Sequence, residues 1–228
     1  MESGRKIVET LILQQPENKL LTASTLYLSL AEQILEANYY KILARLTEQG
    51  ILRRLSRGLY YRPRISKFGE VPFCEEEIVR HYMEGGQGVI IGYRLYRRYG
   101  LTSQNARNIE ILSAHLAEER RTIGNISIRS LSMELDENIR ASIEALEILQ
   151  NYSHIEDVEP TRFNAYMHRF AAGYREEAVH YVLKRRRYKK STIAFLAHCL
   201  DCLQIKNDLQ RYLSPLTQYT IPILEEFP

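Results

Sequence analysis

The feature that most constrains the fold of this chain is a change of hydrophobic periodicity at Gly50. Before this residue, apolar side chains recur every three or four positions, which predicts a series of amphipathic helices. Capping residues and a proline place three such helices near residues 3–16, 22–30 and 35–49. Gly50 then stands where a helix commonly ends in a left-handed conformation.

Two β-prone runs follow Gly50 directly, at residues 51–55 and 59–62. The tripeptide Ser56-Arg57-Gly58 between them suits a tight hairpin turn, and Pro63 closes the second run. Three helices followed by a β-hairpin is the element order of a winged helix-turn-helix domain. The sequence therefore predicts a winged helix within residues 1–68.

The predicted third helix carries a polar stripe, because Asn38, Lys41, Arg45 and Glu48 recur at helical spacing opposite its apolar face. Basic and amide side chains on such a helix can reach phosphates and base edges in the major groove of DNA. Residues 41–67 also hold eight basic residues against one acidic residue. The predicted DNA-binding residues are Asn38, Tyr40, Lys41, Arg45, Arg53, Arg54, Arg57, Arg62 and Arg64. The alternative is a solvated basic surface on a winged helix that binds protein.

Charge is distributed unevenly along the 228 residues: residues 1–70, 71–160 and 161–228 carry +4, −6 and +5, which sum to the net +3.

The overall prediction is a mainly α protein with small β elements (α+β). It has a winged helix at 1–68, an acidic α+β domain at 69–158 and a helical C-terminal region at 159–228. A linker is expected at 64–74. Helices are expected at 75–84, 89–98, 137–149, 163–172, 176–187 and 192–203, the last capped by Ser191, with a shorter helical piece near Leu209 and strands at 109–113 and 122–130.

Two further clusters stand outside the winged helix. Tyr93, Tyr96 and Tyr99 form an aromatic stripe that is typical of core packing or of a protein interface. The second cluster is a basic patch made of Lys184, Arg185, Arg186, Arg187, Lys189 and Lys190. Its composition fits either a solvated helix end or a surface for nucleic acid or an acidic protein.

The cysteines and histidines show no catalytic or metal-binding pattern. Cys199 and Cys202 lie beside His198, but Cys74 is isolated and no second ligand pair has suitable spacing, so we expect free thiols in a reducing cytoplasm. Metalloprotease, nucleophile-elbow and phosphate-loop motifs are missing from the sequence. We therefore expect no catalytic residues, no metal and no cofactor. No apolar run is long enough to span a membrane, and the first residues do not resemble a signal peptide.

Two stretches resemble the winged-helix regulators related to the antitoxins of bacterial abortive-infection (AbiE-type, type IV) toxin-antitoxin systems. The first, residues 43–63 (LARLTEQGILRRLSRGLYYRP), is similar to the end of the family's recognition helix and its wing. The second begins at Gly88-Val-Ile-Ile-Gly92 and continues through Gly100-Leu-Thr-Ser-Gln104 and Asn108-Ile-Glu-Ile111. It resembles the start of the family's second domain, and the likeness covers roughly residues 5–150.

The resemblance implies a non-catalytic bacterial protein that binds the double-stranded DNA of its own promoter and represses its operon. It places recognition at Asn38, Lys41 and Arg45 and wing contacts at Arg53, Arg54 and Arg57. It also implies that an antitoxin-like domain at 69–158 counteracts a nucleotidyltransferase-like toxin. Inverted repeats would require a dimer or two monomers.

Two other functions stay open. One is a protein-interaction module in which the winged helix is a scaffold and the acidic middle domain or the C-terminal helices bind a partner protein. The other is an enzyme that acts on nucleic acid.

Overall fold

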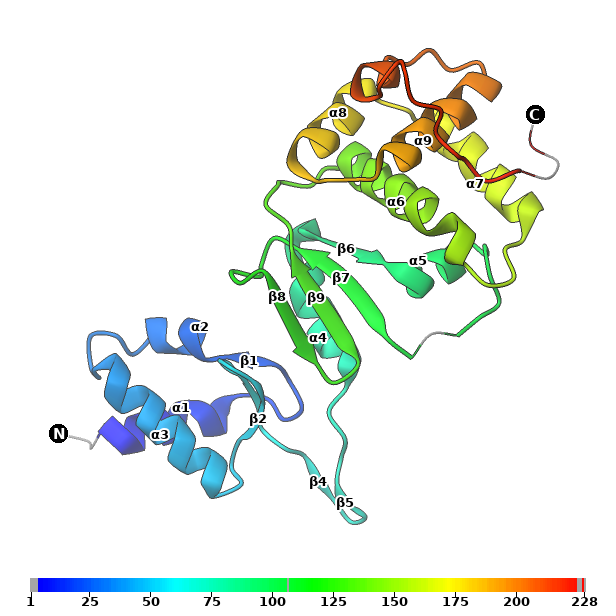
Figure 1. Ribbon diagram of the computed structural model, residues 1–228. Coiled ribbons are helices and arrows are strands. Elements are labelled where there is room, and N and C mark those ends of the chain that lie inside the picture. The colour runs from blue at the N-terminus through cyan, green and yellow to red at the C-terminus, as the bar shows by residue number, and fades with distance from the viewer. Residues whose placement is uncertain (1–3, 106, 225–226, 228) are drawn as a thin grey trace. The chain divides into compact units, whose positions relative to one another are not determined.

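The computed structural model describes residues 4–105, 107–224 and 227. The chain folds into two compact units, Met1–His81 and Tyr82–Pro228. Helices and small sheets occur in both, so the fold is α+β, as the sequence predicts (Figure 1). Among the described residues, no helix has the length and apolar character needed to cross a membrane.

The first unit contains the predicted helices and hairpin. Its elements are α1 (Gly4–Gln14), β1 (Leu21–Thr22), α2 (Ala23–Leu28), α3 (Glu36–Glu48), β2 (Arg53–Ser56) and β3 (Leu59–Tyr61). The strands form an antiparallel sheet in the order β1-β3-β2, which gives the element order of a winged helix. Gly50 and Gly58 both have φ +76°, the left-handed conformation that the end of α3 and the hairpin turn require.

The core of this unit lies between the helices and the sheet. It contains buried residues from all three helices and from β1 and β3, and its fully buried side chains include Val8, Ile12, Tyr39, Leu43, Leu46 and Leu52. The Tyr39 hydroxyl donates a hydrogen bond to the carbonyl of Ala23 (3.0 Å), which satisfies its polar atom inside the core. Leu35, the expected first residue of the third helix, is instead its N-cap and is 75% exposed.

Residues 64–74, expected as a linker, contain a second small hairpin instead. It pairs β4 (Ile65–Ser66) with β5 (Gly69–Glu70). Glu70 accepts hydrogen bonds from Arg53 and from the hydroxyl of Tyr61, so this hairpin is fastened to the first sheet. The following α4 (Glu75–Met83) forms as predicted, with three glutamates in its first turn, where the helix dipole favours negative charge.

The second unit contains a mixed sheet in the order β6-β7-β9-β8. It is made of β6 (Gly88–Ile91), β7 (Ile109–Ser113), β8 (Arg120–Ile123) and β9 (Ile126–Ser130), with β7 parallel to β9 and the other pairs antiparallel. Two expectations are corrected. The stretch 89–98 is not one helix, since its β-branched start forms β6 and only α5 (Gly92–Arg98) is helical. The single strand at 122–130 is a hairpin, because Gly124 (φ +57°) reverses the chain.

Helices follow the sheet in the sequence. They are α6 (Glu137–Asn151), α7 (Pro160–Ala172), α8 (Glu176–Arg185) and α9 (Lys190–Cys202), with the 3₁₀ turns η2 (Tyr152–His154) and η3 (Leu209–Tyr212). A further 3₁₀ turn, η1 (Glu84–Gly86), precedes β6. Asp136 caps α6 by accepting a hydrogen bond from the backbone N–H of Ile139. Ser191 does not cap α9, because the helix starts one residue before it and the cap position is Lys189. Likewise α8 ends at Arg185, since Arg186 has an extended backbone.

One hydrophobic core extends through the second unit. It joins residues of β6 and β7, such as Val89 and Leu112, to residues of α7 and α9, such as Phe163 and Leu196. In Figure 1, α6 lies between the sheet and the last helices. This arrangement differs from the expected division at residue 158, because residues 159–209 complete the core that begins at residue 89.

Candidate nucleic-acid interface

The α3 helix separates apolar and polar side chains onto opposite faces. Tyr39, Ile42, Leu43 and Leu46 are buried in the core of the first unit. The predicted stripe of Asn38, Lys41, Arg45 and Glu48 is exposed along its whole length. Among the described residues, no hydrogen bond or ion pair engages the side chains of Lys41 and Arg45. Two cationic groups are thus available to a ligand on this face.

The hairpin between β2 and β3 presents two more exposed arginines. Arg57 lies in the turn itself, and its side chain has no hydrogen-bond or ion-pair partner within the described ranges. The turn is fixed to the start of α2, because the backbone N–H of Ala23 donates to the carbonyl of Gly58 (2.8 Å). Arg54 makes one weak local contact, from Nε to the carbonyl of Ser56 (3.3 Å).

Two other arginines of the predicted set are engaged inside the protein. Arg53 donates from Nη2 to Oε2 of Glu70 (2.8 Å), and this hydrogen bond lowers the pKa of the Glu70 carboxyl below its usual range. Arg62 donates from Nη1 to the carbonyls of Leu13 (2.8 Å) and Gln15, next to the C-terminal end of α1. Its Nη2 also lies 3.8 Å from a carboxylate oxygen of Glu17. Arg53 and Arg62 therefore have structural partners that the sequence pattern could not show.

The remaining predicted residues lie at the edges of this surface. Tyr40 is 38% exposed and packs edge-on against the ring of Tyr39, with centroids 5.4 Å apart. Arg64 is exposed just before the second hairpin. That hairpin, which the sequence reading missed, has Lys67 and Phe68 in its turn, and the Phe68 ring is 88% exposed. The Lys67 ammonium lies 5.0 Å from the centroid of this ring.

Some residues of the second basic patch contact other parts of the protein, and others are exposed. Arg186 is turned inward onto α6, where Nη2 lies 2.7 Å from Oε1 of Glu147. The Arg185 guanidinium lies 3.7 Å from the centre of the Tyr181 ring, and the Lys190 ammonium donates to the carbonyl of Tyr212. Lys184, Arg187 and Lys189 are exposed.

Two buried glutamates on α6 are important contacts that the sequence reading did not identify. Glu144 is 4% exposed and accepts hydrogen bonds from Arg98 and from the hydroxyl of Tyr99. Glu147 is equally buried and is held by Arg186. Although partial burial lowers the pKa of Arg98, the hydrogen bond and charge of Glu144 outweigh it and raise the pKa. The signal in the sequence is that α6 carries these acids among apolar residues on several sides.

The described cysteines are free thiols. Cys199 is buried in α9, Cys74 is exposed, and Cys202 Sγ lies 3.7 Å from Nε2 of His198.

Elsewhere, ligand atoms of Glu176, His180 and Asp208 lie within 4.8 Å of one another. Both His180 nitrogens already have protein partners, since Nε2 contacts Asp208 (2.6 Å) and Nδ1 contacts the hydroxyl of Tyr212 (2.9 Å). The contacts of His180 with Asp208 and Tyr212 therefore connect η3 and the residue before it to α8.

No family model matches the chain, and no curated protein matches it. Among solved structures, the chain is similar to the RV2827C protein from Mycobacterium tuberculosis, with a TM-score of 0.44 and 12% sequence identity. The similarity covers 86% of this chain and 75% of that chain. A similarity of this degree does not identify a function.

Proposed function

We propose that this protein is a sequence-specific DNA-binding transcriptional autoregulator whose first unit contacts duplex DNA through α3 and the β2–β3 hairpin. The observation that carries the proposal is the presence of Lys41, Arg45 and Arg57 as exposed cations that have no hydrogen-bond or ion-pair partner among the residues that the structure describes. They lie on the two elements with which a winged helix approaches DNA. Phosphate contacts by Lys and Arg supply most of the non-specific affinity for DNA.

The internal contacts of the first unit narrow the set of residues proposed to touch DNA. Arg53 is neutralised by Glu70, and Arg62 is held by carbonyls beside α1. The proposed contact residues are therefore Asn38, Tyr40, Lys41, Arg45, Arg54, Arg57 and Arg64. Asn and Arg can pair with base edges through two hydrogen bonds, so Asn38 and Arg45 are proposed to read sequence. Lys41 and Arg57 are proposed to contact phosphates.

The wider role is that of an antitoxin that represses its own toxin-antitoxin operon. This part of the proposal rests on the resemblance of residues 43–63 and 88–111 to the abortive-infection antitoxins. In this role the chain is non-catalytic, it binds the DNA of its own promoter, and it counteracts a nucleotidyltransferase-like toxin.

Fluorescence anisotropy with labelled duplexes tests the DNA-binding proposal. The full chain is titrated into the DNA upstream of its own gene and into a scrambled duplex of equal composition, over a series of salt concentrations. We expect tighter binding to the upstream duplex that persists at physiological salt. Equal binding to both duplexes that disappears as salt increases would contradict a sequence-specific regulator.

Alanine variants locate the interface. Each phosphate contact that is removed should lower the slope of log affinity against log salt by about 0.9. We expect this change for Lys41→Ala and Arg57→Ala. Arg5→Ala is the matched control, because Arg5 is an exposed cation on α1, outside the proposed surface. If the slopes of all three variants equal that of the wild type, the proposed contact surface is wrong.

Exposed apolar side chains favour a second candidate function, a protein-interaction module. Leu28, Leu35, Ile65 and Phe68 are between 67% and 88% exposed in the first unit. Ile65 and Phe68 lie on the same β4–β5 hairpin, and exposed apolar side chains that lie close together are typical of protein interfaces. Co-expression with the product of the neighbouring gene, followed by size-exclusion chromatography, tests this candidate. A stable complex that Phe68→Ser disrupts, combined with no salt-dependent DNA affinity, would favour it over the regulator.

A further inference from the structure

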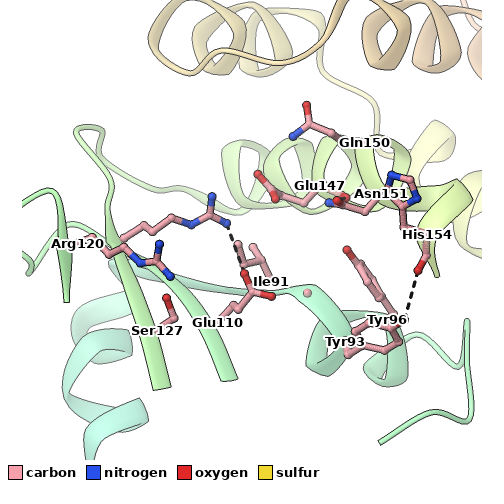
Figure 2. A pocket seen from close by; sticks show the side chains of 12 residues that line it. Ile91, Tyr93, Tyr96, Glu110, Arg120, Ser127, Glu147, Gln150, Asn151 and His154 are labelled. Carbon is pink, nitrogen blue, oxygen red and sulfur yellow. Dashed lines mark hydrogen bonds and ion pairs between the residues drawn. The ribbon is translucent and has the colours of Figure 1, made fainter. Parts of the chain in front are cut away.

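A polar cavity of about 410 Å³ lies within the second unit, between one end of the mixed sheet and α6 (Figure 2). The sheet side contributes Glu110, Arg120 and Arg129, and the helix side contributes Gln150 and Asn151. Tyr93 of α5 lies at one end of the cavity. The volume falls in the range of about 300–1,000 Å³ that is typical of small-molecule sites.

The sheet side of the cavity has an excess of positive charge. Arg120 on β8 and Arg129 on β9 are directly opposite each other in the strand register. Like charges in this position are unfavourable unless a negative group lies between them. Glu110 is an ion-pair partner of Arg129, at 3.7 Å from Nη2 to Oε2, and Arg120 has no ion-pair partner among the described residues. The two guanidinium groups therefore face a single sheet-side carboxylate, which is paired with Arg129 and not with Arg120.

The acidic group on the helix side does not cancel this excess. Glu147 also lines the cavity, but its Oε1 accepts hydrogen bonds from Arg186 and from the hydroxyl of Tyr188 (3.1 Å). Its charge is thus balanced from the side of α8 and the loop that follows. Gln150, Asn151 and His154 also line this wall, and the amides of Gln150 and Asn151 are neutral groups that can donate or accept hydrogen bonds.

Backbone geometry places Glu110 in the cavity. Gly92 begins α5 with φ +65°, and a Cβ atom there would lie 2.5 Å from Oε1 of Glu110. The absence of a side chain at Gly92 leaves the space that this carboxylate occupies. Glu110 therefore reaches towards Arg129 and leaves Arg120 available to a ligand.

We propose that this cavity binds a small organic anion. Arg120 and Arg129 would hold its phosphate or carboxylate group, because a guanidinium presents a planar pair of donors that matches two oxygens of either group. The uncharged part of the ligand would lie against Tyr93, Gln150 and Asn151. The inference goes beyond the proposed function, since every lining residue belongs to Tyr82–Pro228 and none belongs to the proposed DNA surface.

Isothermal titration calorimetry on the full chain tests the proposal with four probes: adenosine monophosphate, citrate, adenosine and inorganic phosphate. We expect one of the two organic anions to bind with one-to-one stoichiometry, at least tenfold more tightly than adenosine or phosphate. The comparison with adenosine isolates the anionic group, and the comparison with phosphate isolates the organic part. The proposal is overturned if neither organic anion binds at millimolar concentration, or if adenosine or phosphate binds equally well.

Variants connect the binding to the two arginines. Removing a charged donor should weaken the organic anion about tenfold or more, so Arg120→Gln and Arg129→Gln are each expected to reduce its affinity by this factor. Arg107→Gln is the control, because Arg107 is exposed and does not line the cavity. Circular dichroism checks that each variant is folded, and Arg129→Lys, which keeps the charge, should lose less affinity than Arg129→Gln. Equal affinities in wild type, Arg120→Gln and Arg129→Gln would refute the assignment.

Discussion

The guanidinium of Arg186 and the carboxylate of Glu147 form an ion pair, 2.7 Å from Nη2 to Oε1, in which the Glu147 side chain is only 4% exposed. The pair connects the residue that follows α8 to the middle of α6. It shows that a run of basic residues in the sequence can contain a side chain with a structural role. The exposed members of the same run, such as Arg187, surround it without sharing that role.

Replacing Arg186 with alanine should destabilise the second unit. The substitution leaves a buried carboxylate without its cation, which costs about 3–5 kcal/mol. Urea unfolding followed by circular dichroism measures the loss. Arg187→Ala removes the same charge from an exposed position and should change the unfolding free energy by no more than about 0.5 kcal/mol. Equal stabilities of the two variants would show that the pair contributes nothing.

Arg62→Ala should destabilise the first unit, although Arg62 belongs to the basic segment expected to contact DNA. The side chain donates to two backbone carbonyls, and charged hydrogen bonds of this kind contribute about 1.5–3 kcal/mol each. A lower urea midpoint is expected for this variant. Arg64→Ala, which removes an exposed arginine two residues away, should unfold like the wild type. A reversed order of stability would contradict the assigned role of Arg62.

Cys74 should react with a thiol reagent well before Cys199. Cys74 is exposed, whereas Cys199 is buried, and burial raises the pKa of the Cys199 thiol. Because the thiolate is the reactive form, Cys199 should stay unmodified in the folded protein and react only after unfolding. Mass spectrometry after timed exposure to iodoacetamide at mildly alkaline pH measures the order. Modification of Cys199 as fast as Cys74 in the folded protein would show that α9 is not packed as described.

Acid should weaken the link between the two hairpins of the first unit. The hydrogen bond from Arg53 lowers the pKa of Glu70, so the folded state binds the proton less readily than the unfolded state. This contribution to stability is therefore present above the unfolded pKa of about 4.3 and is lost as the pH falls through the lower folded pKa. Urea unfolding at a series of pH values should show a smaller acid-induced loss in Glu70→Gln than in the wild type. Parallel curves for the two proteins would count against the link.

The sequence predicts the winged helix well because the signals for it are local. Helical periodicity, Gly50 and the Ser56-Arg57-Gly58 turn act within a few residues of one another, and the structure confirms each of them. The strand β1 was missed because it has two residues and forms only by pairing with β3, some forty positions later. No local sequence pattern predicts a strand of two residues.

For the predicted binding surface, too, the local sequence predicts some features, whereas others depend on residues far away in the chain. Exposure of Lys41 and Arg45 follows from their position on α3, opposite an apolar face. The partners of Arg53 and Arg62 could not be predicted, because Glu70 lies in a hairpin that was read as a linker and Leu13 belongs to the distant α1. In the second unit, the burial of Glu144 and Glu147 depends on elements that cover α6 from several sides, and a pattern with one apolar face does not show this.

The position of β8 at the end of the mixed sheet affects how copies of this protein meet one another. An edge strand presents unpaired backbone groups to which another chain can add a strand, and charged side chains on the edge oppose such addition. Strand β8 carries Arg120, which is exposed and has no ion-pair partner among the described residues, beside Arg121, which is paired with Glu118. A second copy that added a strand at this edge would have to accommodate the charged Arg120 side chain, which opposes edge-to-edge aggregation. The arginine that faces the cavity thus also helps to keep the folded chains apart.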